Sequence, residues 1–275
     1  MSLLTNYHVH TEHSVDAEGS VMKVVAAARR AGIRDIALTD HLDFVPEDPS
    51  CGFFDPDAYL RDVAEARREA RDQIVVRSAV ELGIEHEFVH KAREVAYADF
   101  YSELDFVIGS VHAVEGALLS AKYYRSRNRK QSYEDYFCAL RRAILAVRSE
   151  RIIDVVGHVD LVKRYAPAQY RHAWLDEVRD VVTDLMDTVV ESGLGIEINV
   201  SGLIQAPQEQ FPALDVLRIY RQQGGEILTI GSDSHSVTGL EDCVSELRLG
   251  RQVALAAGFR HICTFARRRP SFVRL

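Results

Sequence analysis

Residues 3–32 read LLTNYHVHTEHSVDAEGSVMKVVAAARRAG and contain the pattern from which the fold is predicted. The run LLTNYHVH is strand-like and ends in a His-x-His pair, His8 and His10. After a polar loop, an amphipathic stretch begins at Ser20, a residue type that caps helix N-termini, and ends at Gly32, a typical helix stop. The chain therefore opens with a strand, a loop and a helix.

The same order recurs along the whole chain. Further strands are predicted at 33–41, 74–85, 104–112, 152–158, 195–202, 226–235 and 259–266, and further helices at 55–73, 86–101, 132–150, 174–193, 211–225 and 239–258. Alternating strands and helices imply parallel strands joined by right-handed crossovers, and this many units favour a closed (β/α) barrel. An open dinucleotide-binding sheet would need a GxGxxG after the first strand, and none is present. No linker divides the chain, so one domain over 1–275 is expected.

Composition limits the class of protein. The 275 residues are 47% hydrophobic and 27% charged, which are ordinary globular values. The four cysteines are scattered without a CxxC pair, which favours free thiols in a reducing cytoplasm. Neither a leader nor an apolar run long enough to cross a bilayer is evident, and the formal net charge of −8 disfavours non-specific binding to nucleic acid.

Polar residues of metal-ligating type lie at or near the C-terminal end of nearly every predicted strand. In chain order they are His8 and His10, Asp40 and His41, Glu81, His112, His158, Asn199, and Asp233 with His235. In a parallel barrel these strand ends meet on one face, where barrel active sites are built. Any one of them is well explained as a loop residue, but independent accidents at seven strand ends are improbable. The other histidines (His13, His86, His90, His172 and His261) are expected to have structural roles.

The order of these motifs resembles the PHP (polymerase and histidinol phosphatase) superfamily. HVHTEHSVD, LTDH, GSVH, GHVD and GSDSH match its motifs in sequence and extend over nearly the whole chain. HTxxSxD, LTDHLDF, GHVDLVKRY and EINVSG are similar, within that superfamily, to stand-alone histidinol-phosphate phosphatases. The resemblance implies an α/β fold, a distorted (β/α)7 barrel of PHP type with its metal site at the C-terminal ends of the strands.

The resemblance also implies a trinuclear metal centre. His8, His10, Glu81 and Asp233 would hold one ion, Glu81 would bridge to a second held by His112 and His158, and Asp16, His41 and His235 would hold the third. Asp16 stands where some members have His, which leaves the identity of that metal open. Asp40 is expected to orient a ligand imidazole rather than to bind metal. Mixed imidazole and carboxylate ligands suit two to three divalent ions of Zn, Fe or Mn.

The expected activity is that of a phosphoric monoester hydrolase. A hydroxide bridging the metals would attack phosphorus, with Glu81, Asp233 and His235 as the catalytic ligands. The implied reaction is hydrolysis of L-histidinol phosphate in histidine biosynthesis. Alternatives are a PHP phosphoesterase acting on other small phosphate esters, such as nucleotides or oligonucleotide ends, and a module without activity. An amidohydrolase would bring a bridging lysine where this chain has Glu81 and His112.

Three residues are candidates for binding the phosphate ester. Arg164 is preferred, because a guanidinium matches phosphate oxygens in a bidentate fork, and Lys163 and Asn199 are further candidates. The cationic end of the substrate is expected to meet acidic residues at the barrel mouth, with Asp160, Glu115 and Asp43 as candidates.

Two basic segments suggest other partners. KYYRSRNRK at 122–130 interleaves arginines with tyrosines, a pattern that also occurs where proteins bind single-stranded nucleic acid. The net acidity favours a loop near the active site instead, and ARRRP at 266–270 is expected to be a solvated tail. The sequence leaves the oligomeric state open, with a homodimer as one alternative.

Overall fold

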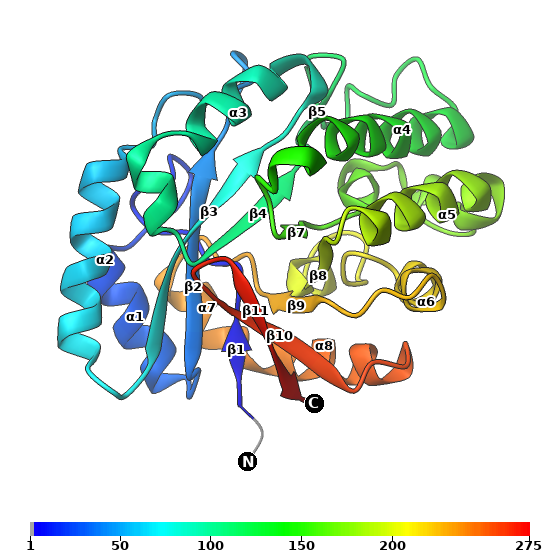
Figure 1. The fold of residues 1–275 in the computed structure, drawn as a ribbon. Helices are drawn as coiled ribbons and strands as arrows, with labels where there is room; N and C mark the ends of the chain where they lie inside the picture. Colours follow the sequence, from blue (N-terminus) through cyan, green and yellow to red (C-terminus); the bar gives the residue numbers. More distant parts are fainter. Residues whose placement is uncertain (1–2) are drawn as a thin grey trace.

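The computed structural model describes residues 3–275, and its centre is a parallel sheet of seven strands. The spatial order of the strands, β1–β2–β3–β4–β7–β8–β9, follows the chain, and helices surround them (Figure 1). The strand bounds are β1 (Thr5–Asn6), β2 (Asp35–Leu42), β3 (Val75–Gly83), β4 (Phe106–Ser110), β7 (Val155–Val156), β8 (Gly195–Asn199) and β9 (Leu228–Gly231). This agrees with the predicted alternation of strands and helices.

The helices lie mostly where the hydrophobic periodicity predicts them. Ser20 caps the first, accepting a hydrogen bond from the backbone N–H of Lys23, and Gly32 follows its end with a φ of +83°. The predicted helix at 86–101 is instead a short helix between two 3-10 turns, and the helix at 239–258 is divided at Cys243. The α-helices are α1 (Val21–Arg30), α2 (Pro56–Ala70), α3 (Val89–Ala96), α4 (Arg129–Val147), α5 (Leu175–Glu191), α6 (Leu214–Gln222), α7 (Val237–Asp242) and α8 (Val244–Ala256). The 3-10 helices are η1 (His86–Phe88), η2 (Asp99–Glu103), η3 (Arg148–Glu150), η4 (Leu161–Tyr165), η5 (Ala168–Tyr170) and η6 (Val200–Leu203).

Backbone hydrogen bonds join the first strand region to the last and nearly close the barrel. The N–H of Tyr7 donates to the carbonyl of Ile230 at 2.9 Å, and the N–H of Asp233 donates to the carbonyl of His8 at 2.8 Å. The N–H of His10 continues the ladder to the carbonyl of Ser234 at 3.0 Å. The fold is therefore the distorted seven-stranded barrel that the resemblance to the PHP superfamily implies, and its closure places the His-x-His pair beside the segment that carries Asp233. The eighth strand predicted at 259–266 lies outside this barrel, in a separate antiparallel pair.

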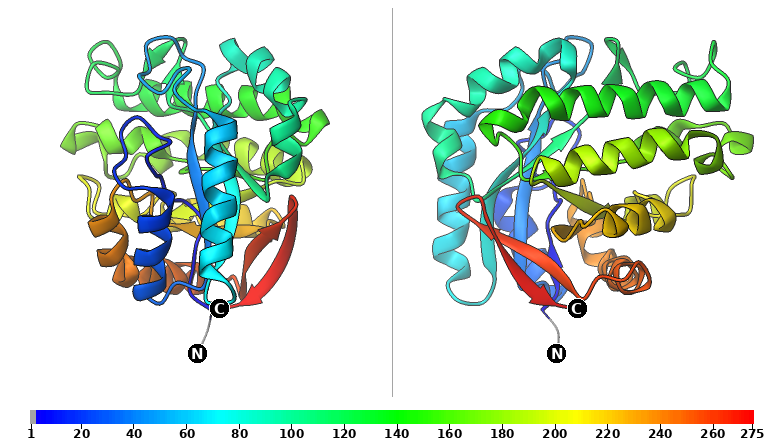
Figure 2. Two further views of the ribbon diagram at one scale, coloured as in Figure 1. Left: turned by 90° about the vertical axis from the view of Figure 1, so that its left-hand side faces the viewer. Right: turned by 45° about the vertical axis from the view of Figure 1, so that its right-hand side comes forward.

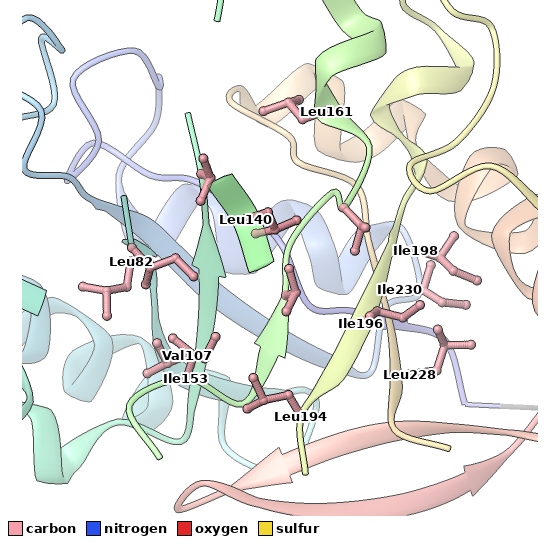
Figure 3. Close-up of a cluster of buried hydrophobic side chains, with 14 of the residues drawn as sticks. Leu82, Val107, Leu140, Ile153, Leu161, Leu194, Ile196, Ile198, Leu228 and Ile230 are labelled. Atoms are coloured by element: carbon pink, nitrogen blue, oxygen red, sulfur yellow. The ribbon is translucent and has the colours of Figure 1, made fainter. Parts of the chain in front are cut away.

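The main apolar core lies between the outer face of the barrel and the helices. Alternate residues of each strand point outward into it, while their neighbours point into the barrel. Figure 3 shows part of this layer, in which Leu82, Val107 and Ile196 from the strands pack with Leu140 of α4. The helices thereby fix which side chains of each strand face the barrel interior.

A second, smaller cluster fills the barrel beneath the site. Tyr7, Phe106 and Phe265 pack edge-to-face or tilted with ring centroids 4.8–6.4 Å apart. Phe265 belongs to the antiparallel hairpin of β10 (His261–Ala266) and β11 (Arg269–Arg274), which lies across the end of the barrel where both chain termini are found (Figures 1 and 2). The floor of the barrel is therefore closed, and its interior is accessible from the opposite, C-terminal face.

The arginine run at 266–270 is mostly exposed, as expected, but it is part of this hairpin and not a tail. Arg267 and Arg268 form the tight turn between β10 and β11, both with positive φ. Arg268 pairs with Asp154 and donates to the carbonyl of Ile152. The turn is thus anchored to the start of β7.

Within residues 3–275, no helix is both long enough and apolar enough to cross a membrane.

Candidate metal centre

Glu81 is the centre of a buried group of imidazoles at the C-terminal ends of the strands. The register of β2 and β3 pairs His41 with Glu81, so their side chains emerge next to each other into the barrel. One carboxylate oxygen of Glu81 lies 3.2 Å from both His8 Nε2 and His41 Nδ1. The other lies 2.8 Å from His158 Nε2 and 3.3 Å from His112 Nε2. One carboxylate therefore stands between two sets of imidazoles.

A second carboxylate, Asp233, lies on the other side of the His-x-His pair. Its Oδ1 is 3.3 Å from His10 Nε2 and 3.6 Å from His8 Nε2. Asp233 has a φ of +56°, a left-handed conformation uncommon for residues other than glycine and often found at functional sites. The turn after β9 thus directs its carboxylate toward the two histidines.

The remaining predicted ligands form the open side of the group. The ring centroid of His10 lies 4.3 Å from that of His41 and 4.1 Å from that of His235. Asp16 is half exposed, and its Oδ2 lies 3.4 Å from His235 Nε2 and 3.8 Å from His41 Nε2. All the ligands predicted from the sequence are thus brought into one contiguous group.

The chemistry of this group fits divalent metal ions. His8 Nε2, His10 Nε2 and His41 Nδ1 are buried and form no hydrogen bond, although they face carboxylates and one another. Three groups of side chains each have their donor atoms within 4.8 Å of one another: His8, His10 and Asp233; His41, Glu81 and His112; and His10, His41 and His235. Burial and the nearby imidazoles of His235 and His41 hold the pKa of His10 well below its usual value, which favours the neutral form that binds metal. A cation would give these unpartnered nitrogens the partner that they lack.

Glu197 orients two of the predicted ligands, and sequence reasoning missed it. It is fully buried, and its Oε1 accepts a hydrogen bond from His8 Nδ1 at 2.7 Å. Its Oε2 accepts from the backbone N–H of His158 at 3.0 Å and from the side chain of Asn199 at 3.3 Å. With its Nδ1 proton held in this way, His8 presents Nε2 to the cluster, the usual arrangement of a metal-binding histidine. The signal was available, because Glu197 lies two residues before Asn199 and therefore on the same face of β8.

Asp43 and Asp40 support the cluster from the β2 side. Asp43 is buried rather than exposed at the mouth, and its Oδ1 accepts from His112 Nδ1 at 3.2 Å. The imidazoles of His112 and His41 hold the pKa of this carboxyl below its usual value against the opposing effect of burial. Asp40 acts through Ser14, whose hydroxyl donates to Asp40 and accepts from His10 Nδ1 at 3.1 Å. Asp40 therefore orients an imidazole, as expected, but through one intervening hydroxyl.

Above the cluster is a cavity of about 200 Å³. Arg164 lines it, with Nη2 donating to Asp233 Oδ2 and to Ser201 Oγ, both at 3.0 Å. The other lining residues outside the predicted ligand set are Asp48, Ser50, Leu118, Leu119, Leu161 and Tyr165. The cavity thus has one guanidinium beside the cluster and an apolar portion of wall.

Lys163 and Asn199 do not reach this cavity, and we correct the expectation that they bind substrate. The ammonium of Lys163 is fully buried and is held by Asp160 at 3.0 Å, Glu209 at 2.9 Å and the carbonyl of Gln210 at 2.7 Å. The 3-10 turn η4 points Lys163 away from the site and Arg164 toward it. Asn199 is fully buried behind His8, where it contacts Glu197 and caps the backbone N–H of Ser201.

The acidic residues expected to attract a cationic substrate are also placed differently. Asp160 is fully buried against Lys163, and Asp43 supports His112. Glu115 is exposed, and its nearest basic partner is Arg127, 3.8 Å away. None of these three lines the cavity described above.

The Arg/Tyr segment at 122–130 does not present its aromatic rings to a partner. Tyr123 and Tyr124 are buried, and their hydroxyls donate to the carbonyls of Ser132 and Val162. Arg127 pairs with Asp135, and Arg129 pairs with Glu177. The interleaving that suggested base stacking is therefore a packed loop. It follows the small hairpin of β5 (Ala113–Val114) and β6 (Ala117–Leu118).

Comparisons with known proteins identify the family and the fold. The chain is 26% identical over 263 residues to the histidinol-phosphatase of Lactococcus lactis, covering 95% of this chain and 94% of that protein. It is 28% identical over 229 residues to a probable histidinol-phosphatase of Clostridium acetobutylicum, covering 83% and 85% of the two chains. The fold matches the crystal structure of L. lactis histidinol phosphate phosphatase, which is complexed with zinc, L-histidinol and phosphate. The TM-score is 0.85 at 24% identity, covering 98% of this chain and all of that one. Residues 6–201 match the PHP domain, and the chain belongs to that family.

Proposed function

We propose that this protein is a metal-dependent phosphomonoesterase that hydrolyses L-histidinol phosphate to L-histidinol and phosphate. The observation that carries the proposal is the position of Arg164, which lines the same cavity as Glu81 and the imidazoles of His41, His112, His158 and His235. A phosphate dianion entering this cavity would meet a guanidinium on one side and the ligand cluster on the other. The names of the relatives, and the L-histidinol and phosphate bound in the solved L. lactis enzyme, support histidinol phosphate as the substrate.

The proposed ligands are those of the buried cluster. His8, His10, Glu81 and Asp233 would hold one ion, and Glu81, His112 and His158 a second. Asp16, His41 and His235 would hold a third, with Zn, Fe or Mn suited to all three sites. When bound, such ions lower the pKa of water and neutralise charge on a phosphoryl group.

The residues around the ligands have separate tasks. Arg164 binds the phosphate oxygens, and Asp233 orients the guanidinium through the 3.0 Å contact with its Nη2. Glu197 holds the proton on His8 Nδ1, and Asp43 holds the proton on His112 Nδ1, so that both rings keep one tautomer. The apolar wall formed by the leucines limits the water that reaches the bound ester.

A phosphate-release assay across substrates tests the proposal. Protein loaded separately with Zn, Fe and Mn is offered histidinol phosphate, other small phosphomonoesters, nucleotides and 5′-phosphorylated oligonucleotides. We expect the highest kcat/KM with histidinol phosphate. A higher kcat/KM with a nucleotide or an oligonucleotide end would favour the alternative PHP phosphoesterase, and no release from any ester would overturn the enzymatic assignment.

A further inference from the structure

We propose that Asp48 is the specificity-determining residue that binds the ammonium group of the substrate. Asp48 lies on the loop between β2 and α2 and lines the cavity above the ligand cluster. This inference rests on the proposed function, because it concerns how the same cavity selects its phosphate ester. It also replaces the three acidic residues that sequence reasoning placed at the barrel mouth.

The first observation concerns the partners of the carboxylates that line the cavity. Asp16, Glu81 and Asp233 each lie within 3.4 Å of an imidazole or guanidinium nitrogen. Asp48 differs from them, because no basic side chain in residues 3–275 forms an ion pair with it. Asp48 is therefore the lining carboxylate whose charge is left for a ligand.

The second observation is that the Asp48 side chain is fixed in place. Its Oδ1 accepts a hydrogen bond from the backbone N–H of Ser50 at 2.8 Å, and Ser50 itself is buried. The backbone N–H of Asp48 donates to Val45, and its carbonyl accepts from Cys51, so two successive turns hold the loop. A carboxylate held in this way loses little conformational freedom when it binds a cation.

The chemistry of the proposed substrate matches the charges of the cavity. Histidinol phosphate carries a phosphate at one end and an amine and an imidazole at the other. An imidazole with an ordinary pKa of about 6.5 is mostly neutral above pH 7, whereas the amine is largely cationic. Arg164 and the ligand cluster take the anionic end, the leucines of the wall take the ring, and Asp48 takes the ammonium group.

A pair of substrates separates this role from general effects on the active site. The first is L-histidinol phosphate, and the second is 3-(imidazol-4-yl)propyl phosphate, which lacks only the amine. The measured quantity is the ratio of kcat/KM for the first substrate to kcat/KM for the second. Because both substrates are measured on one preparation, partial unfolding or metal loss lowers both values and leaves the ratio unaffected.

Asp48→Asn keeps an oxygen that accepts from the backbone N–H of Ser50 and removes the charge. We expect the ratio of the two kcat/KM values to fall about 10- to 100-fold, which corresponds to the loss of one charged hydrogen bond. Asp48→Glu keeps the charge and should retain a larger ratio than Asp48→Asn. The matched control is Glu47→Gln, which removes a charge from the adjacent exposed residue outside the cavity and should keep the wild-type ratio.

Two results would overturn the inference while leaving the proposed function intact. One is an unchanged ratio in Asp48→Asn, and the other is an equal fall in the ratio for Glu47→Gln, which would indicate a long-range effect of net charge. Wild-type protein that releases no phosphate from histidinol phosphate, but does so from other esters, would overturn the proposed function and this inference together.

Discussion

Replacing Glu197 with glutamine tests whether the buried support of His8 maintains the metal centre. Glu197 accepts three hydrogen bonds, from His8 Nδ1, from the backbone N–H of His158 and from the side chain of Asn199. Glutamine has nearly the same shape but one oxygen, and its amide N–H groups face donors. At least one buried donor therefore loses its acceptor.

Two magnitudes follow from this geometry. Loss of a buried hydrogen-bond acceptor lowers the free energy of unfolding by about 1–3 kcal/mol. Loss of the charge that holds the His8 tautomer weakens metal binding or activity about 10- to 100-fold, as for other outer partners of metal-binding histidines. We therefore expect Glu197→Gln to fold, to bind metal more weakly and to release phosphate more slowly.

The assay combines three measurements on the variant and on a matched control. Metal content is measured by elemental analysis after dialysis against graded chelator, unfolding is followed in urea, and phosphate release is measured at saturating metal. Glu65→Gln makes the same chemical change on the exposed side of α2 and should behave as wild type. A Glu197→Gln variant that is less stable but keeps wild-type metal affinity and kcat/KM would refute the reasoning, because Glu197 would then only support the fold.

Three further substitutions test the ligand cluster, the phosphate contact and the barrel floor. Glu81→Gln should abolish most metal binding and activity, because it removes the charge shared by two sets of imidazoles, whereas His13→Ala should have a small effect. Equal effects of the two substitutions on metal content and on phosphate release would contradict the ligand assignment. Arg164→Ala should raise KM and lower kcat for histidinol phosphate in steady-state assays, because the contact between the guanidinium and the phosphate oxygens persists as charge develops on the phosphoryl group. Unchanged kinetics would exclude this contact. Phe265→Ala should lower the free energy of unfolding, measured in urea, by about 3–5 kcal/mol. Phe272 lies on the same hairpin but is 53% exposed, so Phe272→Ala should change the free energy of unfolding little, and similar losses in the two variants would contradict the packed floor.

The fold and the ligand cluster could be predicted because both depend on regular features of the sequence. Hydrophobic periodicity fixes strands and helices, and parallel topology then brings the strand ends to one face. A proposed ligand such as His41 or His158 therefore needs only its position at the end of a strand to be placed in the cluster. The ring-to-carboxylate contacts around Glu81 follow from the same registers.

The residues around the cluster could not be placed in this way. Lys163 and Arg164 are adjacent in the sequence, yet the turn of η4 buries one against Asp160 and directs the other to Asp233. In irregular segments no period of two relates sequence position to side-chain direction, so the preference for Arg164 rested on the chemistry of its guanidinium and not on its position. Glu197 was missed for a different reason. It lies on a regular strand, two residues before Asn199 and therefore on the same face, so it could have been found from the sequence.

The inward faces of β2 and β3 show how the barrel isolates Glu81, a proposed metal ligand, from solvent. Read from the floor upward, β2 presents Asp35, Ala37, Thr39 and His41, and β3 presents Arg77, Ala79 and Glu81. Asp35 and Arg77 pair at the base, and the small alanines leave room for the aromatic rings of the floor cluster. This floor separates Glu81 from solvent on the N-terminal side, and the side chain of Glu81 is almost fully buried. A buried carboxylate is costly unless it is paired. Glu81 accepts hydrogen bonds from Ser110 Oγ at 2.6 Å and from His158 Nε2 at 2.8 Å, whereas the His8 Nε2 and His41 Nδ1 atoms that face it have no hydrogen-bond partner. Metal bound to the proposed ligands would therefore help to stabilise the upper half of the barrel, and metal binding would then be linked to folding at this end of the molecule.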